Sequence, residues 1–103
     1  MVHFSFYVPV ESAEKVKAAL FAAGAGKIGN YDQCCFEIKG KGQFRPLEGH
    51  KAFIGQTNLV EYVEELKIEL VCEDHLVESV VKALKSSHPY ETPAYYAIKT
   101  LNI

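Results

Sequence analysis

Two kinds of hydrophobic periodicity alternate along this chain, and their order limits the fold more than any other feature. A first strand is predicted over residues 2–8, because apolar side chains fill every second position: Val2, Phe4, Phe6 and Val8. Pro9 ends that strand, and a helical period begins at about Ser12. The apolar stripe of this helix is Ala13, Val16, Leu20 and Ala23. Gly24 follows where a left-handed terminating residue is needed.

The remaining chain repeats the alternation. A second strand over residues 34–39 runs into a predicted glycine turn at 39–42, and residues 40–59 are expected to hold a short hairpin arm and a loop. A third strand is predicted over residues 66–72, and a start as early as Val60 is the alternative. Asp74 is predicted to cap a second helix that stops near Ser87, and the last strand runs from about Ala94 to Leu101.

This order, strand, helix, strand, strand, helix, strand, predicts an α+β fold. Right-handed crossovers place both helices on one face of a four-stranded antiparallel sheet, which is the ferredoxin-like βαββαβ arrangement. No linker or low-complexity tract interrupts the chain, so residues 1–103 are expected to form a single domain.

The sheet face without helices is predicted to be mixed in polarity. The face toward the helices is expected to carry Phe4, Phe36 and Ile68, with Cys34 pointing into the core and Cys35 to the other side. The opposite face then carries His3, Ser5, Tyr7, Glu37, Lys39, Lys67, Glu69, Val71 and Lys99. Charges interleaved with Tyr7 and Val71 suit a contact between subunits, and the small size of the chain favours self-association.

Composition narrows the class of partner. The 11 basic and 13 acidic residues give a net charge of −2, so neither nucleic acid nor a membrane is predicted as a partner. The N-terminus has no signal-peptide pattern, and no apolar run is long enough to span a membrane. Three cysteines are an odd number and favour reduced thiols, so we expect a cytoplasmic protein.

The segment His88–Tyr95, here called the cassette, is the most distinctive polar motif. Pro89 and Pro93 keep the residues before them out of the helical region, so the segment is expected to be extended and stiff. It presents an imidazole, a phenol and a carboxylate in fixed relation, which suits a binding edge or a subunit contact.

Other motifs carry weaker chemistry. Gly24–Gly29 has the spacing of a dinucleotide fingerprint, but it follows a helix instead of a strand, so a helix stop and tight loop are predicted. Its amides beside Lys27 remain candidates for holding an anion. No histidine pair has zinc-ligand spacing, which leaves a metal site built between subunits from His88, Glu91 or Cys35 as an alternative.

No catalytic constellation is evident. Ser86, Ser87 and His88 are adjacent, and neighbours on a helix end do not face one another as a nucleophile and its base must. The sequence therefore predicts a protein that is not an enzyme.

The cassette and many spaced positions carry a family resemblance. The element order and the run His88-Pro89-Tyr90-Glu91 with Pro93 resemble the CutA and PII-like group of trimeric ferredoxin-like proteins. A closer match rests on Gly24-Ala25-Gly26, Gly29-Asn30-Tyr31, Cys34, Phe36, Gly40-Lys41-Gly42, Phe44-Arg45-Pro46, Gly49, Ile54-Gly55 and Glu65. These resemble the YqfO-type domain that is inserted in many Nif-three-like dinuclear-metal proteins and also occurs as a free small protein, as we expect here.

The resemblance limits what can be transferred. In Nif-three-like proteins, the two-metal site and the GTP cyclohydrolase activity for which they are often named belong to flanking lobes that this chain lacks. A hydrolase or cyclohydrolase is therefore the least supported hypothesis here. The CutA likeness implies a divalent metal, copper, as an alternative cofactor. The PII likeness places effectors near the loop between the second and third strands, and residues 40–59 lack a phosphate-binding signature.

We therefore predict a non-catalytic homotrimer that binds a small ligand or a protein partner in clefts between subunits. The predicted ligand or interface residues are Lys27, Tyr31, Phe44, Arg45, His88, Tyr90, Glu91 and Tyr95. Arg45 has the geometry to bind a carboxylate or phosphate, and the tyrosines supply apolar walls with polar tips. The alternative is that Arg45 pairs with Glu91 or Glu48 while the tyrosines pack the subunit contact.

Overall fold

The predicted order of strands and helices is present in the structure, a computed structural model that describes residues 1–103. The four strands are β1 (Val2–Pro9), β2 (Phe36–Phe44), β3 (Glu61–Cys72) and β4 (Tyr95–Lys99). The helices are α1 (Ala13–Ala22) and α2 (Val77–Ser87), each preceded by a short 3-10 turn, η1 (Val10–Ser12) and η2 (Asp74–Leu76).

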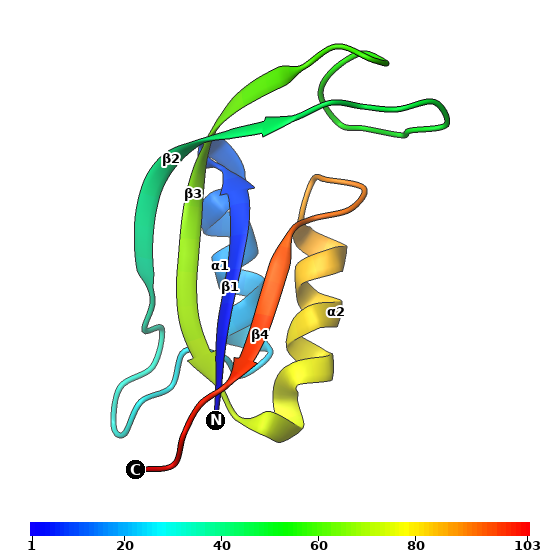
Figure 1. The fold of residues 1–103 in the computed structure, drawn as a ribbon. Coiled ribbons are helices and arrows are strands. Elements are labelled where there is room, and N and C mark those ends of the chain that lie inside the picture. Colours follow the sequence, from blue (N-terminus) through cyan, green and yellow to red (C-terminus); the bar gives the residue numbers. More distant parts are fainter.

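The strands form one antiparallel sheet in the order β2-β3-β1-β4. Both helices pack on the same side of this sheet, and the other side, here called the open face, is bare in Figure 1. The α+β ferredoxin-like prediction is thereby confirmed.

The core lies between the sheet and the two helices. β1 contributes Val2, Phe4, Phe6 and Val8, as its two-residue period predicts, and α1 contributes Ala13, Val16 and Leu20. β3 and α2 complete it with Ile68, Leu70, Cys72, Val80 and Leu84. Gly24 follows the end of α1, and its φ of +102° is the left-handed conformation that glycine adopts without strain.

The predicted facing of β2 is wrong by one residue. Glu37 pairs across the ladder with Ile68, so it faces the helices, where its carboxylate accepts a 2.5 Å hydrogen bond from Lys17 of α1. Phe36 and Ile38 therefore lie on the open face, 65% and 46% exposed. Cys35, and not Cys34, packs against the core. The sulfhydryl of Cys34 instead lies 3.6 Å from the carbonyl oxygen of Asp32.

The physical reason is the position of β2 at the edge of the sheet. An edge strand is only partly covered by α1, so a charged side chain on its helix side reaches a lysine and water instead of the core. Lys39 shares that side with Glu37. Lys99 was also predicted on the open face, but it lies opposite Val2 on the helix side and pairs with Asp74.

Two local predictions also fail. No turn forms at residues 39–42, because β2 continues through both glycines to Phe44 while paired with β3. Asp74 makes no side-chain cap on α2. Its carboxylate instead accepts hydrogen bonds from the amino group of Met1 and from Lys99, which tie both ends of the chain to η2.

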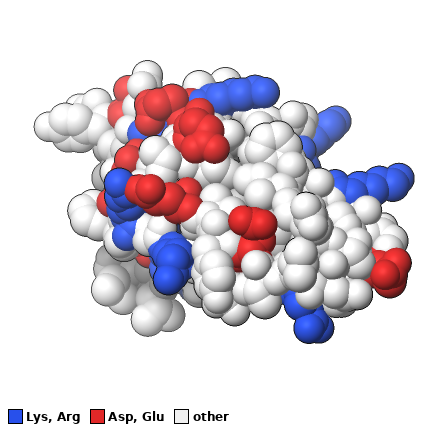
Figure 2. Space-filling model, turned by 90° about the horizontal axis from the view of Figure 1, so that it is seen from above, with Lys and Arg blue, Asp and Glu red and all other residues white.

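The paired ends of β2 and β3, residues 40–44 and 61–65, project beyond the rest of the sheet with the loop 45–60, and we call this projection the arm. In Figure 1 the arm bends over the end of the molecule that carries the cassette. Figure 2, seen from above that end, shows basic and acidic groups interspersed without an extended area of one sign. Neither helix has the length and hydrophobicity that crossing a membrane requires.

Candidate functional site

A cavity of about 370 Å³ lies between the arm and the cassette, and we call it the arm cavity. Its apolar lining consists of Phe44, Pro46, Ala52, Phe53, Ile54 and Ala94. Its polar lining includes the carboxylates of Glu65 and Glu91 together with the phenols of Tyr7 and Tyr90. It thus combines apolar walls with a few polar groups, which is typical of sites for small ligands.

His88 fixes the cassette to the sheet. This residue is only 7% exposed, and its ring contacts Tyr90 at a centroid distance of 4.9 Å. The backbone N–H of Tyr90 donates to Nδ1 over 3.1 Å, so Nε2 carries the proton and donates to the carbonyl oxygen of Tyr7 over 2.6 Å. Burial lowers the pKa of His88. The hydrogen bond to Tyr7 favours the charged imidazole and acts in the opposite direction, but its effect is smaller.

Tyr90 connects the cassette to the arm. Its hydroxyl donates a 2.8 Å hydrogen bond to Oε2 of Glu65, and its ring lies 6.1 Å from that of Phe44. Burial and the neighbouring Glu65 carboxylate both raise the pKa of Tyr90, which keeps the phenol protonated as a donor. The Glu65 side chain crosses β2 at Gly42, where a β-carbon would overlap its carboxylate.

The second carboxylate orders the loop of the arm. Oε1 of Glu91 accepts a 3.0 Å hydrogen bond from the backbone N–H of Lys51. Nearby, His50 shares a 2.8 Å hydrogen bond with Thr57 through Nε2 and accepts the backbone N–H of Ala52 at Nδ1. These bonds hold the loop over the cavity.

The structure brings together only part of the predicted site. Phe44, Tyr90 and Glu91 line the arm cavity, and His88 lies behind Tyr90 as its support. Arg45 is exposed and forms no ion pair, with Glu91, Glu48 or any other carboxylate.

The other predicted residues lie elsewhere. Tyr95 packs on the core side, stacked 5.9 Å from Phe4. Lys27 and Tyr31 belong to the loop that is joined to the far end of β3 through the bond from Gly26 N–H to the carbonyl of Val71. Within one chain, the loop between α1 and β2 lies at the opposite end of the molecule from the cassette (Figure 1).

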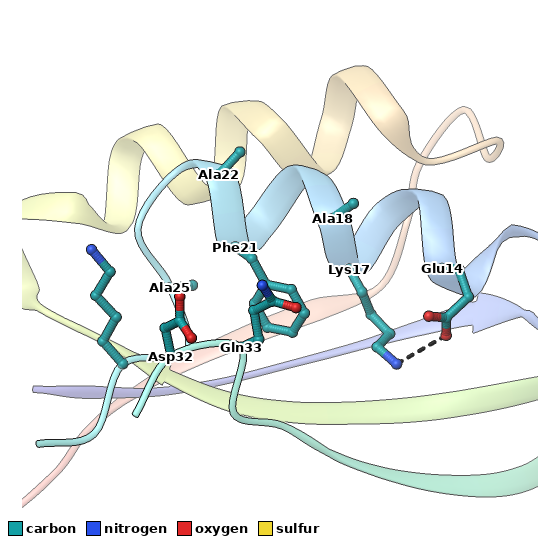
Figure 3. A pocket seen from close by; sticks show the side chains of 9 residues that line it. Glu14, Lys17, Ala18, Phe21, Ala22, Ala25, Asp32 and Gln33 are labelled. Atoms are coloured by element: carbon teal, nitrogen blue, oxygen red, sulfur yellow. Dashed lines mark hydrogen bonds and ion pairs between the residues drawn. The ribbon is translucent and has the colours of Figure 1, made fainter. Parts of the chain in front are cut away.

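A second hollow of about 340 Å³ runs between α1 and the loop that holds Lys27. Figure 3 shows Lys17 and Glu14 paired on its wall, with Phe21 between the helix and the loop. Its two lysines are balanced by Glu14 and Asp32, and Lys17 is already bound to Glu14 and Glu37. Because its charges are already compensated, we consider the arm cavity the stronger candidate.

The structure contains no group of three histidine, cysteine or acidic side chains placed to hold a metal ion. Both ring nitrogens of His88 are engaged by backbone groups. Cys35 lies on the helix side near Lys17, and burial raises the pKa of its thiol, which disfavours the thiolate that binds metals. The three candidate ligands His88, Glu91 and Cys35 therefore do not form one site within a chain.

Sequence reasoning missed Glu65, Gly42 and His50 as components of the cavity. In the sequence, Glu65 was recognised only as part of the family pattern. Gly42 was assigned to a predicted turn, so the close approach of another group that a glycine within a strand often marks was not foreseen.

Comparisons with known proteins place this geometry in context. No protein-family model matches the chain. It is 49% identical over 89 residues to a protein named GTP cyclohydrolase 1 type 2 homolog from Halalkalibacterium halodurans, a match covering 86% of this chain and 24% of that protein. The protein of the same name from Bacillus subtilis is 47% identical over 89 residues, with the same coverage. The chain thus spans about a quarter of the length of these relatives.

Solved structures share the fold. A Bacillus cereus protein related to NIF3 superposes with a TM-score of 0.84 at 40% identity, covering 98% of this chain and 26% of that one. CutA1 from Pyrococcus horikoshii gives a TM-score of 0.71 at 23% identity, covering 100% and 86%. The periplasmic divalent cation tolerance protein CutA from Archaeoglobus fulgidus gives 0.70 at 19% identity, covering 99% and 86%. At these low identities the likeness to CutA proteins concerns the fold alone.

Proposed function

We propose that this chain, as a CutA-like domain of the kind found in Nif-three-like proteins, is a non-catalytic, homotrimeric binding domain. The trimer would hold a small ligand or a protein partner in clefts between its subunits. We place it in the cytoplasm, as its reduced thiols favour.

The observation that carries the proposal is the uncovered open face. Besides Phe36 and Ile38 on β2, it exposes 56% of Tyr96 and 60% of Ile98 on β4. Between these edges the Glu69 carboxylate forms an ion pair with Lys67 at 3.5 Å and lies 3.8 Å from Nε2 of His3. Apolar groups at the edges of a sheet with paired charges between them suit a contact with another copy, where the apolar area leaves water.

A cleft between subunits would also bring the predicted residues together. Lys27 and Tyr31 lie at the end of the sheet opposite to the cassette, so a single chain does not place them near Tyr90. In an assembly, the loop of one copy can approach the arm cavity of its neighbour. This is the arrangement that we propose for the ligand cleft.

We propose that the domain is not catalytic because the polar side chains around the cassette are already engaged in hydrogen bonds within the chain. The imidazole of His88 is fixed by two bonds to backbone groups, and Glu65 accepts a hydrogen bond from the Tyr90 hydroxyl. The name GTP cyclohydrolase belongs to relatives of which this chain spans about a quarter. A divalent metal bound between copies remains the alternative, tested by adding zinc or copper and measuring the bound stoichiometry in wild type and His88→Ala.

The test is the oligomeric state in solution. Sedimentation velocity of the wild-type protein at micromolar concentration is expected to show a trimer, and Ile38→Glu or Ile98→Glu is expected to give a folded monomer. Ile103→Glu makes the same chemical change beyond β4 and is expected to leave the trimer intact. A monomeric wild type, or a trimer unaffected by the two open-face variants, would contradict the proposal.

A further inference from the structure

The arm cavity is aromatic and acidic at once, and no lysine or arginine side chain lines it. Arg45 and Lys51 are adjacent in sequence to lining residues, but both are exposed. Lys67, the other nearby base, is bound to Glu69 on the open face. His50 also lines the cavity, but its Nε2 is bonded to Thr57 and its Nδ1 accepts the N–H of Ala52. The acidic groups that face the cavity are the two carboxylates of Glu65 and Glu91.

Each carboxylate is held by one oxygen and leaves the other without a hydrogen bond from the chain. Oε2 of Glu65 accepts the Tyr90 hydroxyl, and Oε1 of Glu91 accepts the Lys51 N–H. These two bonds fix both carboxylates in place. Glu65 of the arm is held by a donor from the cassette, and Glu91 of the cassette is held by a donor from the arm. The two unbound oxygens are acceptors only, so they select a ligand that donates hydrogen bonds and carries positive charge.

The walls favour the same kind of ligand. The rings of Phe44 and Tyr90 meet at 6.1 Å, and Phe53 adds a third aromatic group to the lining. Aromatic faces attract cations through their quadrupole and bury an apolar stem at the same time. A phosphate or carboxylate would instead meet two like charges, and the imidazole of His50 is already engaged with Thr57 and Ala52.

Resting on the proposed role as a ligand-binding domain, we infer that the arm cavity binds an organic cation, an ammonium or guanidinium group on an apolar stem. The sequence suggests an anionic ligand bound by Arg45, whereas this assignment gives the ligand a positive charge. It depends on the position of the Glu65 carboxylate, which only a glycine at position 42 permits.

Two glycines of β2 supply a matched test of that position. A methyl group at Gly42 would displace the Glu65 carboxylate, whereas a methyl group at Gly40 would meet no atom within 4 Å. Neither glycine has a positive φ, so alanine is compatible with the backbone at both positions. Gly42→Ala therefore perturbs the carboxylate, and Gly40→Ala is its control in the same strand.

The experiment is calorimetric titration of the full chain with two probes of opposite charge, 3-phenylpropylammonium and 3-phenylpropionate. The cation is expected to bind at least about tenfold more tightly than the anion, with an affinity that falls as salt is added. Glu65→Gln, Glu91→Gln and Gly42→Ala are each expected to weaken the cation about fivefold or more. Glu64→Gln, whose side chain pairs with Lys39 outside the cavity, and Gly40→Ala are expected to change nothing. Equal binding of both probes, no binding of the cation, or binding unaffected by the three variants would overturn the inference.

Two sources of such a cation are distinguished by sedimentation of the same variants. If the natural occupant is a lysine or arginine of a second copy, Glu65→Gln weakens self-association as well as probe binding. If it is a free amine, Glu65→Gln weakens probe binding and leaves the assembly unchanged. Both results support a cation site. Failure of the proposed trimer would appear as a monomeric wild type, and the titration would remain informative because all lining residues come from one chain.

Discussion

The role of His88 as the anchor of the cassette makes a quantitative prediction about stability. His88→Ala removes the donor to the Tyr7 carbonyl and the acceptor for the Tyr90 N–H, and it leaves a void beside the Tyr90 ring. Two net hydrogen bonds at about 1 kcal/mol each and about 1 kcal/mol of lost apolar burial give roughly 3 kcal/mol. For a chain of 103 residues this lowers the Tm by roughly 12–24 °C.

Isosteric replacements separate the two bonds. Asn at position 88 retains an acceptor near Nδ1 for Tyr90 but leaves the Tyr7 carbonyl unpaired, at a cost of about 1.5 kcal/mol. Gln retains a donor near Nε2 and loses the acceptor, with a similar cost of about 1.5 kcal/mol. His75→Asn is the control, because His75 is exposed in η2 and forms no side-chain hydrogen bond.

The sign of the pH dependence follows from the lowered pKa of His88. The unfolded chain titrates at the ordinary histidine pKa of about 6.5, so below that pH it binds a proton that the folded chain refuses. The stabilisation by neutral His88 is complete above about pH 7.5 and is lost as the pH falls through 6.5 and on through the folded pKa. The two neutral variants lack this contribution.

The assay is thermal unfolding by circular dichroism at pH 5.5–8.0 and one fixed protein concentration, because the proposed assembly would make the Tm depend on concentration. The Tm of the wild type is expected to fall more steeply toward pH 5.5 than that of His88→Asn, so that the two curves converge. Parallel curves would show that His88 is not buried in its neutral form. An Ala variant as stable as the wild type would show that the two bonds do not hold the cassette.

Two further predictions concern other parts of the fold. The hydrogen bonds from Lys99 and the amino group of Met1 lower the pKa of Asp74 to about 2. The contribution of these bonds to stability is therefore lost as the pH falls from about 4 through 2, and Asp74→Asn should flatten the acid side of a plot of Tm against pH. Gly26→Ala should destabilise the fold by about 2 kcal/mol or more, because its φ is +82° and its methyl group would press on Phe21 and a carbonyl. Gly29→Ala has a positive φ but open space, so chemical denaturation should show only about 1 kcal/mol there.

The sequence was sufficient for the elements whose polarity pattern is set by burial. β1 and the core side of β3 are covered by both helices, so their two-residue periods translate directly into buried positions such as Phe6 and Ile68. The same holds for α1 and α2, whose stripes face the sheet. The element order then left the ferredoxin-like topology as the natural connection, and the order β2-β3-β1-β4 agrees with it.

β2 shows where such reasoning fails. Its alternation of Phe36 and Ile38 with Glu37 and Lys39 is regular, but the apolar set faces away from the helices. Periodicity alone identifies two faces and not which of them is covered. For an edge strand with a lysine of α1 within reach, the charged face is the one that meets the helix.

The arm cavity was beyond prediction for a different reason. Its walls come from three parts of the chain that are far apart in sequence: β1 at Tyr7, the arm, and the cassette. Their meeting depends on the register of β2 and β3 beyond the sheet and on the bond from Tyr90 to Glu65, 25 residues away. Local patterns carry no information about such contacts.

The corrected facing of β2 connects the two proposals. Residues opposite one another in the ladders share a face, so Tyr7 and Glu65, which line the arm cavity, belong to the same side of the sheet as Phe36 and Ile98. A copy that covers the open face therefore lies next to the cavity. If the cavity is more complete in the assembly, a cation binds the trimer more tightly than the monomer. By linkage, saturating cation must then raise the association constant of the trimer by that factor for each of its three cavities, so assembly and ligand binding form one equilibrium.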